Sequence, residues 1–150
     1  MLLLASACGE GTGIRTNQYQ PLVCATGDGS TATAVIGTAG GRVAVRGHSL
    51  TVPASAVAGP TTFRITERTA TFIGVEVEPH GQAFGRNATL TLSYARCGGN
   101  PAGFQNLRVV EVRSGTTDII RVLPSAVDSA GRTVTTTGLN HLSGYLIAGT

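Results

Sequence analysis

The chain contains no lysine and no tryptophan, and it carries few charged and few aromatic side chains. All 11 basic residues are arginine, and charged residues make up only 13% of the 150 positions. The arginines are scattered without a cluster, so the basic stripe that a nucleic-acid-binding protein directs at phosphates is missing from the sequence. Aromatic residues account for 5% of the chain, which leaves few rings for stacking on sugars. We therefore expect no nucleic-acid partner.

Long hydrophobic runs and the common cofactor motifs are missing as well. No segment approaches the ~20 consecutive apolar residues of a transmembrane helix. The sequence has no P-loop, no GxSxG elbow and no Rossmann glycine pattern. It also has no CxxC or CxxH spacing, which zinc sites commonly use. We therefore predict a protein without a cofactor.

Glycine and aliphatic residues dominate what is present. The chain has 21 glycines, many of them between short apolar runs, where the turns of an all-β protein would lie. Hydrophobic residues make up 41% of the 150 positions, which is enough for the core of a single domain. With so few aromatic residues, this core must depend on Val, Ile, Leu and Ala.

Short segments of alternating polar and apolar residues recur through residues 40–150. Leu90, Leu92 and Tyr94, for example, share one face of a strand because strand side chains alternate with a period of two. No segment shows a sustained 3.6-residue period, so long helices are not expected. We predict an all-β fold, either a β-sandwich or a partly open barrel of short antiparallel strands. The expected strands lie at 42–46, 61–68, 72–77, 88–94, 105–112, 119–123, 132–137 and 141–148, and a further short strand through Leu50 and Val52 ends at Pro53.

Residues 1–8 resemble the end of a bacterial lipoprotein signal. The segment LASAC, which ends at Cys8, is similar to a lipobox, in which a diacylglycerol is attached to the cysteine thiol. The apolar stretch before it is shorter than the roughly 7–15 residues of a complete leader, and we interpret it as a truncated signal peptide. We predict lipid attachment at Cys8 and export to the bacterial cell envelope, with membrane contact through the lipid. An unmodified tail or the remnant of an ordinary signal peptide is the alternative.

Cys24 and Cys97 form an even pair once Cys8 carries lipid. In an exported chain such a pair predicts a disulfide, with two free thiols as the alternative. Closing this long loop would stabilise the fold by about 4 kcal/mol in the chain-entropy model. The Gly- and Thr-rich residues 9–39 are predicted to be a flexible tether with a first short strand at 23–25.

Three motifs within residues 40–150 resemble the ZU5 domain family. They are GGRVAVRGHSLTVPASAV from residue 40, PHGQAFGRNATLTLSY at 79–94, and NHLSGYLIA at 140–148. In the family, the first contains an LxVPxxAV signature, the second a Pro-x-Gly-x-x-Phe turn, and the third a closing strand. The resemblance implies a β-sandwich that acts as an interaction or scaffold module. We therefore expect a non-enzymatic envelope domain with a protein partner whose identity is open.

One branch of this family suggests a different function. Some ZU5-like domains cleave themselves within a His-Phe-Ser triplet, where the serine hydroxyl attacks the preceding carbonyl. The corresponding residues here are His141, Leu142 and Ser143, so Phe is replaced by Leu. The alternative hypotheses are therefore self-cleavage at the Leu142–Ser143 bond, with Ser143 as nucleophile and His141 as base, or an ordinary closing strand.

A further hypothesis concerns a metal site. Glu76, Glu78 and His80 fall at positions i, i+2 and i+4, so one strand face could present all three to a metal ion such as zinc. A solvated strand face is the alternative. A surface module that binds glycan or metal is thus the second rival to the interaction module.

Overall fold

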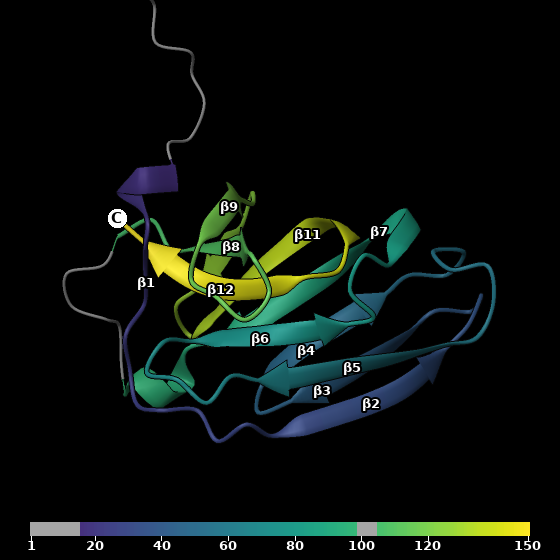
Figure 1. The fold of residues 1–150 in the computed structure, drawn as a ribbon, viewed down its shortest axis with the longest axis horizontal. Coiled ribbons are helices and arrows are strands. Elements are labelled where there is room, and N and C mark those ends of the chain that lie inside the picture. Colours follow the sequence, from purple (N-terminus) through teal and green to yellow (C-terminus); the bar gives the residue numbers. More distant parts are fainter. Residues whose placement is uncertain (1–15, 99–104) are drawn as a thin grey trace, which may run out of the picture.

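A computed structural model describes residues 16–98 and 105–150, and almost all of its regular structure is β-strand (Figure 1). Two 3-10 helices also occur, η1 (Thr16–Gln18) and η2 (Ala95–Cys97). No helix among the described residues is long and apolar enough to cross a membrane. The strands are β1 (Gln20–Pro21), β2 (Thr31–Ile36), β3 (Gly41–Val45), β4 (His48–Val52), β5 (Thr61–Glu67), β6 (Gly74–Glu78), β7 (Ala83–Ser93), β8 (Arg108–Val112), β9 (Ile119–Val122), β10 (Ala126–Asp128), β11 (Thr133–His141) and β12 (Gly144–Gly149).

The strands form two antiparallel sheets. The first sheet has the order β2-β5-β6-β12-β8-β9, and β1 also pairs with β12. The second sheet has the order β10-β11-β7-β4-β3. The two sheets pack face to face and no closed barrel forms, so the prediction of an all-β sandwich is confirmed.

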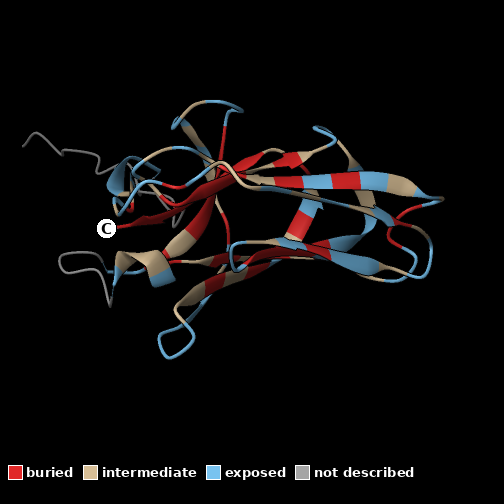
Figure 2. Cartoon of the chain, turned by 90° about the horizontal axis from the view of Figure 1, so that it is seen from below, coloured by how far each residue is buried: buried red, intermediate tan, exposed pale blue. Residues whose placement is uncertain are grey.

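The core lies between the two sheets and follows the predicted period of two. On β5, Phe63 and Ile65 are fully buried, and on β4 Leu50 and Val52 are buried. Buried residues, red in Figure 2, occur in the strands of both layers. Each such aliphatic or aromatic side chain contributes about 1.5–3 kcal/mol when it leaves water, so the interior accounts for the stability of the sandwich without tryptophan.

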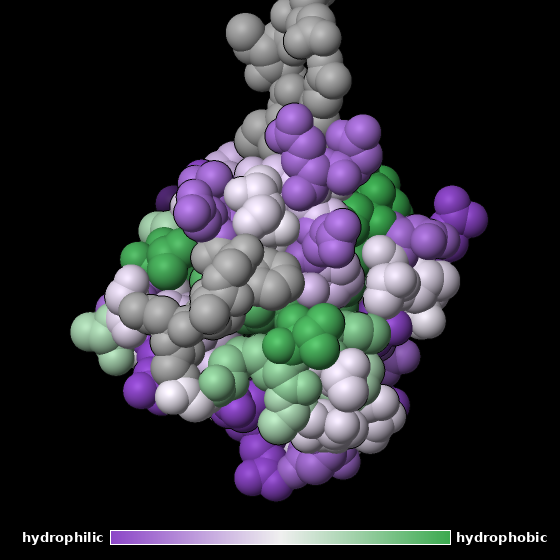
Figure 3. Space-filling model, turned by 90° about the vertical axis from the view of Figure 1, so that its left-hand side faces the viewer, coloured by the Kyte–Doolittle hydropathy of each residue, from purple (hydrophilic) through white to green (hydrophobic). Residues whose placement is uncertain are grey.

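The strand β12 is buried on both of its faces. Its residues alternate between the main core and a second, smaller apolar cluster. The smaller cluster consists of Val110, Val112, Leu146 and Ala148, with Tyr19, Phe72, Ile119 and Val122 packed against it. On the face drawn in Figure 3, the exposed apolar groups (green) are separated by polar groups (purple and white).

Part of the predicted tether belongs to the first sheet. Strand β2 pairs with β5 along all six of its residues, so the prediction of a tether does not hold for Thr31–Ile36. The sequence TATAVI has small side chains and one large buried residue, Ile36, which gives a weak strand signal. The strand predicted at 23–25 is reduced to a single bridge between Val23 and Phe72. Cys8 lies outside the described residues.

One row across the first sheet carries two buried carboxylates. Glu67 on β5 lies opposite Val75 on β6, and Val75 lies opposite Tyr145 on β12. Tyr145 in turn lies opposite Glu111 on β8. Glu67 and Glu111 are each only 5% exposed. Residues that pair directly share a face of the sheet, so both carboxylates lie on the face that carries Val75 and Tyr145.

Candidate functional site

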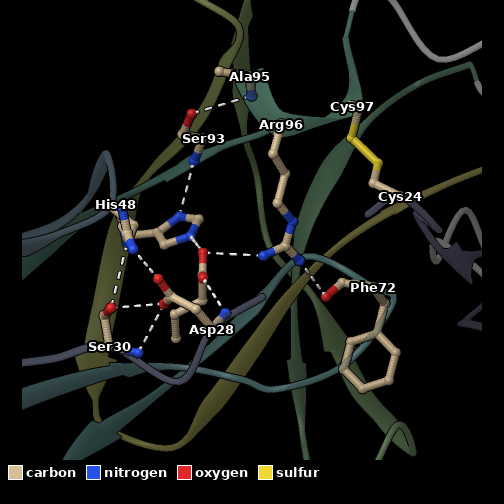
Figure 4. A network of polar contacts seen from close by, with 11 residues as sticks. Cys24, Asp28, Ser30, His48, Phe72, Ser93, Ala95, Arg96 and Cys97 are labelled. Carbon is tan, nitrogen blue, oxygen red and sulfur yellow. Dashed lines mark hydrogen bonds and ion pairs between the residues drawn. A yellow bond between two sulfur atoms is a disulfide. The ribbon is translucent and has the colours of Figure 1, made fainter. Parts of the chain in front are cut away.

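A cavity of about 460 Å³ is the best candidate for a functional site. A network of polar contacts joins the side chains around it (Figure 4). We call His48, Glu67 and Arg96 the buried cluster. The residues that line the cavity are Thr26, Asp28, Arg46, His48, Glu67, Ser93, Ala95 and Arg96.

Strand periodicity brings His48 and Glu67 together from different sheets. His48 is the first residue of β4 and shares the inward phase of Leu50 and Val52. Glu67 is the last residue of β5 and continues the buried series of Phe63 and Ile65. The two polar side chains therefore occupy the positions where each strand's apolar face ends, and they join the two sheets at that point.

The hydrogen bonds of His48 define its protonation state. The backbone N–H of Ser93 donates to Nδ1 of His48 at 3.1 Å, so Nδ1 carries no proton. Nε2 therefore carries the proton and donates to Oε2 of Glu67 at 2.8 Å. Burial lowers the pKa of His48 below its usual value, although Glu67 acts in the opposite direction. His48 is thus a neutral imidazole with both nitrogens engaged.

Glu67 is held by contacts from three segments of the chain. Its Oε1 accepts the backbone N–H of Asp28 at 3.1 Å. Its Oε2 lies 3.1 Å from Nη1 of Arg96, whose Nη2 donates to the carbonyl oxygen of Phe72 at 2.8 Å. Because both partners are largely buried, the ion pair compensates two charges that would otherwise be costly to desolvate.

A glycine makes room for this ion pair. A Cβ atom at Gly27 would lie 2.5 Å from Nη1 of Arg96 and 2.9 Å from Oε1 of Glu67. It would also lie 2.3 Å from the carbonyl oxygen of Arg68, which cannot move aside easily because it belongs to the backbone. The chain after β1 can therefore approach the buried cluster only with glycine at this position.

The predicted disulfide between Cys24 and Cys97 is present. Cys97 directly follows Arg96 in η2, and Cys24 lies shortly before Gly27. The disulfide therefore ties together the two segments that enclose the buried cluster, as Figure 4 shows. This link is consistent with an exported protein.

Asp28 and Arg46 are exposed residues of the cavity lining, and Ser30 contacts both of them. The Ser30 hydroxyl donates to Oδ1 of Asp28 at 2.6 Å, and Arg46 forms an ion pair with Oδ2. The pKa of the Asp28 carboxyl is held well below its usual range, mainly by the hydrogen bond from the Ser30 side chain and next by the one from Arg46. The cavity thus presents carboxylates and guanidinium groups that are already paired with one another.

This arrangement favours structural roles over acid–base chemistry. His48 has no free nitrogen to accept a proton, because Nδ1 already accepts the Ser93 N–H. The Ser93 hydroxyl accepts the backbone N–H of Ala95 at 3.2 Å, and Ser93 contacts His48 through its backbone N–H. A base must lie within hydrogen-bond reach of the proton that it removes. Among the described residues of this cavity, no hydroxyl has that relation to the imidazole.

A second cluster of the same residue types includes the predicted self-cleavage residue His141. Nε2 of His141 lies 2.5 Å from Oε1 of Glu111, and Nη2 of Arg121 lies 3.1 Å from Oε2 of the same carboxylate. Glu111 is on β8 and His141 on β11, so this contact also joins the two sheets. We call His141, Glu111 and Arg121 the rim cluster.

The structure does not pair His141 with Ser143. The two ring nitrogens of His141 contact Glu111 and the side-chain oxygen of Asn140, the latter at 2.7 Å. The Ser143 hydroxyl instead donates to the carbonyl oxygen of Val112 at 3.0 Å. The base and nucleophile of the self-cleavage hypothesis are thus engaged with other partners.

Tyr145 extends the rim cluster into the core. Its hydroxyl donates to the carbonyl oxygen of His141 at 2.7 Å. Burial raises the pKa of the Tyr145 hydroxyl far above its usual value, and the nearby Glu111 carboxylate adds to this shift. Tyr145 is therefore a neutral hydrogen-bond donor that fixes the end of β11.

The predicted metal trio does not assemble. His80 Nε2 lies 3.3 Å from a carboxylate oxygen of Glu76, but Glu78 pairs with Arg64 at 3.4 Å. Strand β6 ends at Glu78, so His80 lies beyond the strand whose alternation led to the hypothesis. Glu76 also accepts the backbone N–H of Gly115 at 2.9 Å. In residues 16–98 and 105–150, no three His, Cys, Asp or Glu side chains are placed to hold a metal ion.

Glu76 instead lies at a second, shallower cavity of about 640 Å³. Arg68 lies 3.8 Å from Glu76, and the Ser114 hydroxyl donates to the same carboxylate at 3.1 Å. Glu76, like Glu67, therefore serves several contacts within the protein. The residues lining this cavity include Gly29, Thr66, Arg68, Glu76, Glu78, His80 and Ser114.

No protein-family model matches the chain. A search of curated proteins also finds no significant match. The resemblance to ZU5 domains therefore stays a prediction.

Proposed function

We propose that this protein is an exported, non-enzymatic β-sandwich that makes protein contacts or maintains envelope architecture, and that a lipid on Cys8 anchors it to a membrane. The observation that carries the proposal is the engagement of its acid–base groups. Both His–Glu pairs at the sheet ends are used as contacts between the sheets. Groups that hold a fold together in this way are poorly placed to exchange protons with a substrate.

The disulfide supports the export part of this proposal. Disulfides persist in oxidising compartments and are rare in the cytosol. The Cys24–Cys97 bridge leaves Cys8 as the third cysteine of the chain. This arrangement matches the lipobox-like sequence before Cys8, because lipidation needs an unpaired thiol. One lipid-modified residue would hold the protein at a membrane surface without spanning it.

Intact mass under denaturing conditions tests both parts of the proposal. The protein is produced behind a bacterial secretion leader and extracted with detergent. We expect one uncut chain that carries the added mass of a diacylglycerol, and we expect Cys8→Ser to lose that mass and to leave the detergent phase. Ser6→Ala, which retains the Cys8 thiol, is the matched control and should behave like the parent.

Two results would overturn the proposal. Equal detergent partitioning of the parent and Cys8→Ser would remove the lipid anchor. Fragments that meet at the Leu142–Ser143 bond would replace the non-enzymatic function with self-cleavage. The disulfide joins residues on the N-terminal side of that bond, so it would not mask the fragments.

A further inference from the structure

Strand β2 forms one border of the first sheet, and no other strand of residues 16–98 and 105–150 pairs with its outer edge. It pairs with β5 on one side and stands at the end of the strand order (Figure 1). In an antiparallel strand, alternate residues direct their N–H and C=O groups to opposite edges. About half of the backbone polar groups of β2 therefore face away from β5. Thr31, Thr33 and Val35 are exposed along this strand, and Val35 is 70% exposed.

The edge of β2 lacks the features that usually prevent strand pairing. Natural edge strands are often very short, bulged, or marked by charged residues or proline. Strand β2 has six residues, TATAVI, without charge, proline or glycine. The other described border strands are interrupted: β10 has three residues, β9 pairs with β8 through a register shift, and β3 includes Gly41 and Arg42.

We propose that β2 pairs antiparallel with β2 of a second copy of this chain, about a two-fold axis at Thr33. An axis perpendicular to the sheet places Thr33 opposite itself and Ala32 opposite Ala34 of the second copy. The first sheets of the two copies then become one continuous sheet. This inference deepens the proposed function by naming one protein partner. It rests on the proposed function in one respect, which is that the domain acts by contacting other proteins.

The side chains of β2 fit this two-fold register. Ala32 and Ala34 are the small, partly buried residues on the inner face, so the two sandwiches can approach closely at the axis. Thr31 would lie opposite the exposed Val35 of the second copy, a pair of β-branched side chains that suits a strand. Ile36 is 2% exposed and packs toward Gly41, so it stays within its own sandwich.

Two further observations favour a second copy over a foreign peptide. Neither of the two cavities described above is lined by residues of β2, so neither offers this edge a pocket for selecting the side chains of another sequence. The strand also carries no charge, so no like charges meet at the axis. The net charge of +3 on each copy opposes association only at long range, and salt at 0.15 M screens charges beyond about 8 Å.

Sedimentation velocity of the full chain carrying Cys8→Ser tests the pairing. This substitution removes the proposed lipid site, so lipid-driven association cannot contribute, and the result is independent of the anchor. A contact of one strand is smaller than the roughly 1,200–2,000 Å² of a standard interface, so we expect a reversible dimer. The mass at 0.15 M salt should rise with concentration from 15.2 kDa toward twice that value.

Thr33→Lys is the decisive variant, because it places two lysines opposite each other at the axis. We expect it to remain at the monomer mass at concentrations where the parent is mostly dimeric. Thr51→Lys is the matched control and should dimerise like the parent. It adds the same charge at an exposed threonine of β4, which lies between β3 and β7 and has no open edge.

Several outcomes would overturn the proposal. The first is a parent protein that stays monomeric up to ~1 mM, well above the micromolar range of ordinary interfaces. The second is equal dissociation of the dimer by Thr33→Lys and Thr51→Lys. The third is growth of the parent into species larger than a dimer. Matching circular dichroism spectra and melting temperatures of Thr33→Lys and the parent show that a lost dimer is not a lost fold.

Discussion

The buried cluster and the rim cluster use the same three residue types in two different environments. Each joins the sheets through a His–Glu contact, and each adds an arginine to the carboxylate. In the buried cluster the side chain of His48 is 2% exposed, whereas that of His141 in the rim cluster is 37% exposed. The corresponding arginines, Arg96 and Arg121, are 20% and 41% exposed. Burial, rather than residue type, therefore distinguishes the two clusters.

The two histidines also differ in what surrounds them. His48 faces one backbone donor and one carboxylate acceptor, which suits the neutral ring. His141 faces oxygen atoms at both nitrogens, an arrangement in which both nitrogens can donate. The comparison teaches that the same pair of residues can be enclosed by the protein at one end of a sheet row and stay open to solvent at the other.

The largest expected effect is the loss of a carboxylate from the buried cluster. Glu67→Gln leaves the largely buried Arg96 without its counter-charge, and breaking a buried pair in this way costs about 3–5 kcal/mol. Glu111→Gln should lower the free energy of unfolding by only about 1 kcal/mol, because the Arg121 and His141 side chains that lose their partner are 41% and 37% exposed. Urea denaturation of the two variants gives both values. Equal losses would show that burial does not separate the clusters.

The second prediction concerns the disulfide, which encloses only the buried cluster. Replacing Cys24 and Cys97 by alanine opens a link between residues 73 positions apart. The chain-entropy model gives a loss of about 4 kcal/mol. In double-mutant cycles we expect this loss to be non-additive with Glu67→Gln and additive with Glu111→Gln, since contacting groups couple and distant ones do not. Additive behaviour in both cycles would contradict the assigned role of the bridge.

The smallest expected effect is on the pH dependence of stability. Burial holds the pKa of His48 below its usual value, so the unfolded chain binds this proton before the folded protein does. The free energy of unfolding should therefore fall as the pH is lowered through and below the usual histidine value of about 6.5. His48→Gln should remove this part of the slope in urea midpoints measured at pH 7, 6 and 5. An unchanged slope would mean that His48 is not the buried neutral group.

His141→Gln is the matched comparison for this experiment. The imidazole of His141 is 37% exposed, so it is open to solvent, unlike that of His48. We expect this variant to retain the acid-side loss of stability that depends on His48. A profile that is flattened equally by both substitutions would remove the difference between the two clusters.

The fold was predictable from the sequence because side-chain alternation reflects burial directly. Leu90 and Leu92, for example, lie on the inner face as their period of two predicts. Strand β2 was not predictable as a border strand, because its alternating threonine and alanine residues resemble a polar linker. The pairing of Cys24 with Cys97 could be predicted because only two cysteines remained once Cys8 was set aside.

The buried cluster was harder to predict, because its members are far apart in the chain and come from three elements. The available signal was the phase of Glu67, which continues the inward series of Phe63 and Ile65. In the rim cluster, Glu111 gives the same signal because it shares the phase of Val109. A charged residue at an inward-facing strand position implies that another side chain pairs with it. Which side chain does so depends on the sheet topology, which the sequence does not give. The spacing of Glu76, Glu78 and His80 left a metal site and a solvated strand face both open, because it does not show that the strand ends at Glu78.

The disulfide also determines how tension would travel through the molecule. A pull on the chain ahead of Thr16 reaches Cys24 after passing the two-residue strand β1. The covalent bond then transfers the load to Cys97, which follows β7, the 11-residue strand between β11 and β4. Force applied at the N-terminal end would therefore bypass residues 25–96, which lie inside the loop that the disulfide closes, and β2, β5 and β6 of the first sheet would not be peeled away one after another.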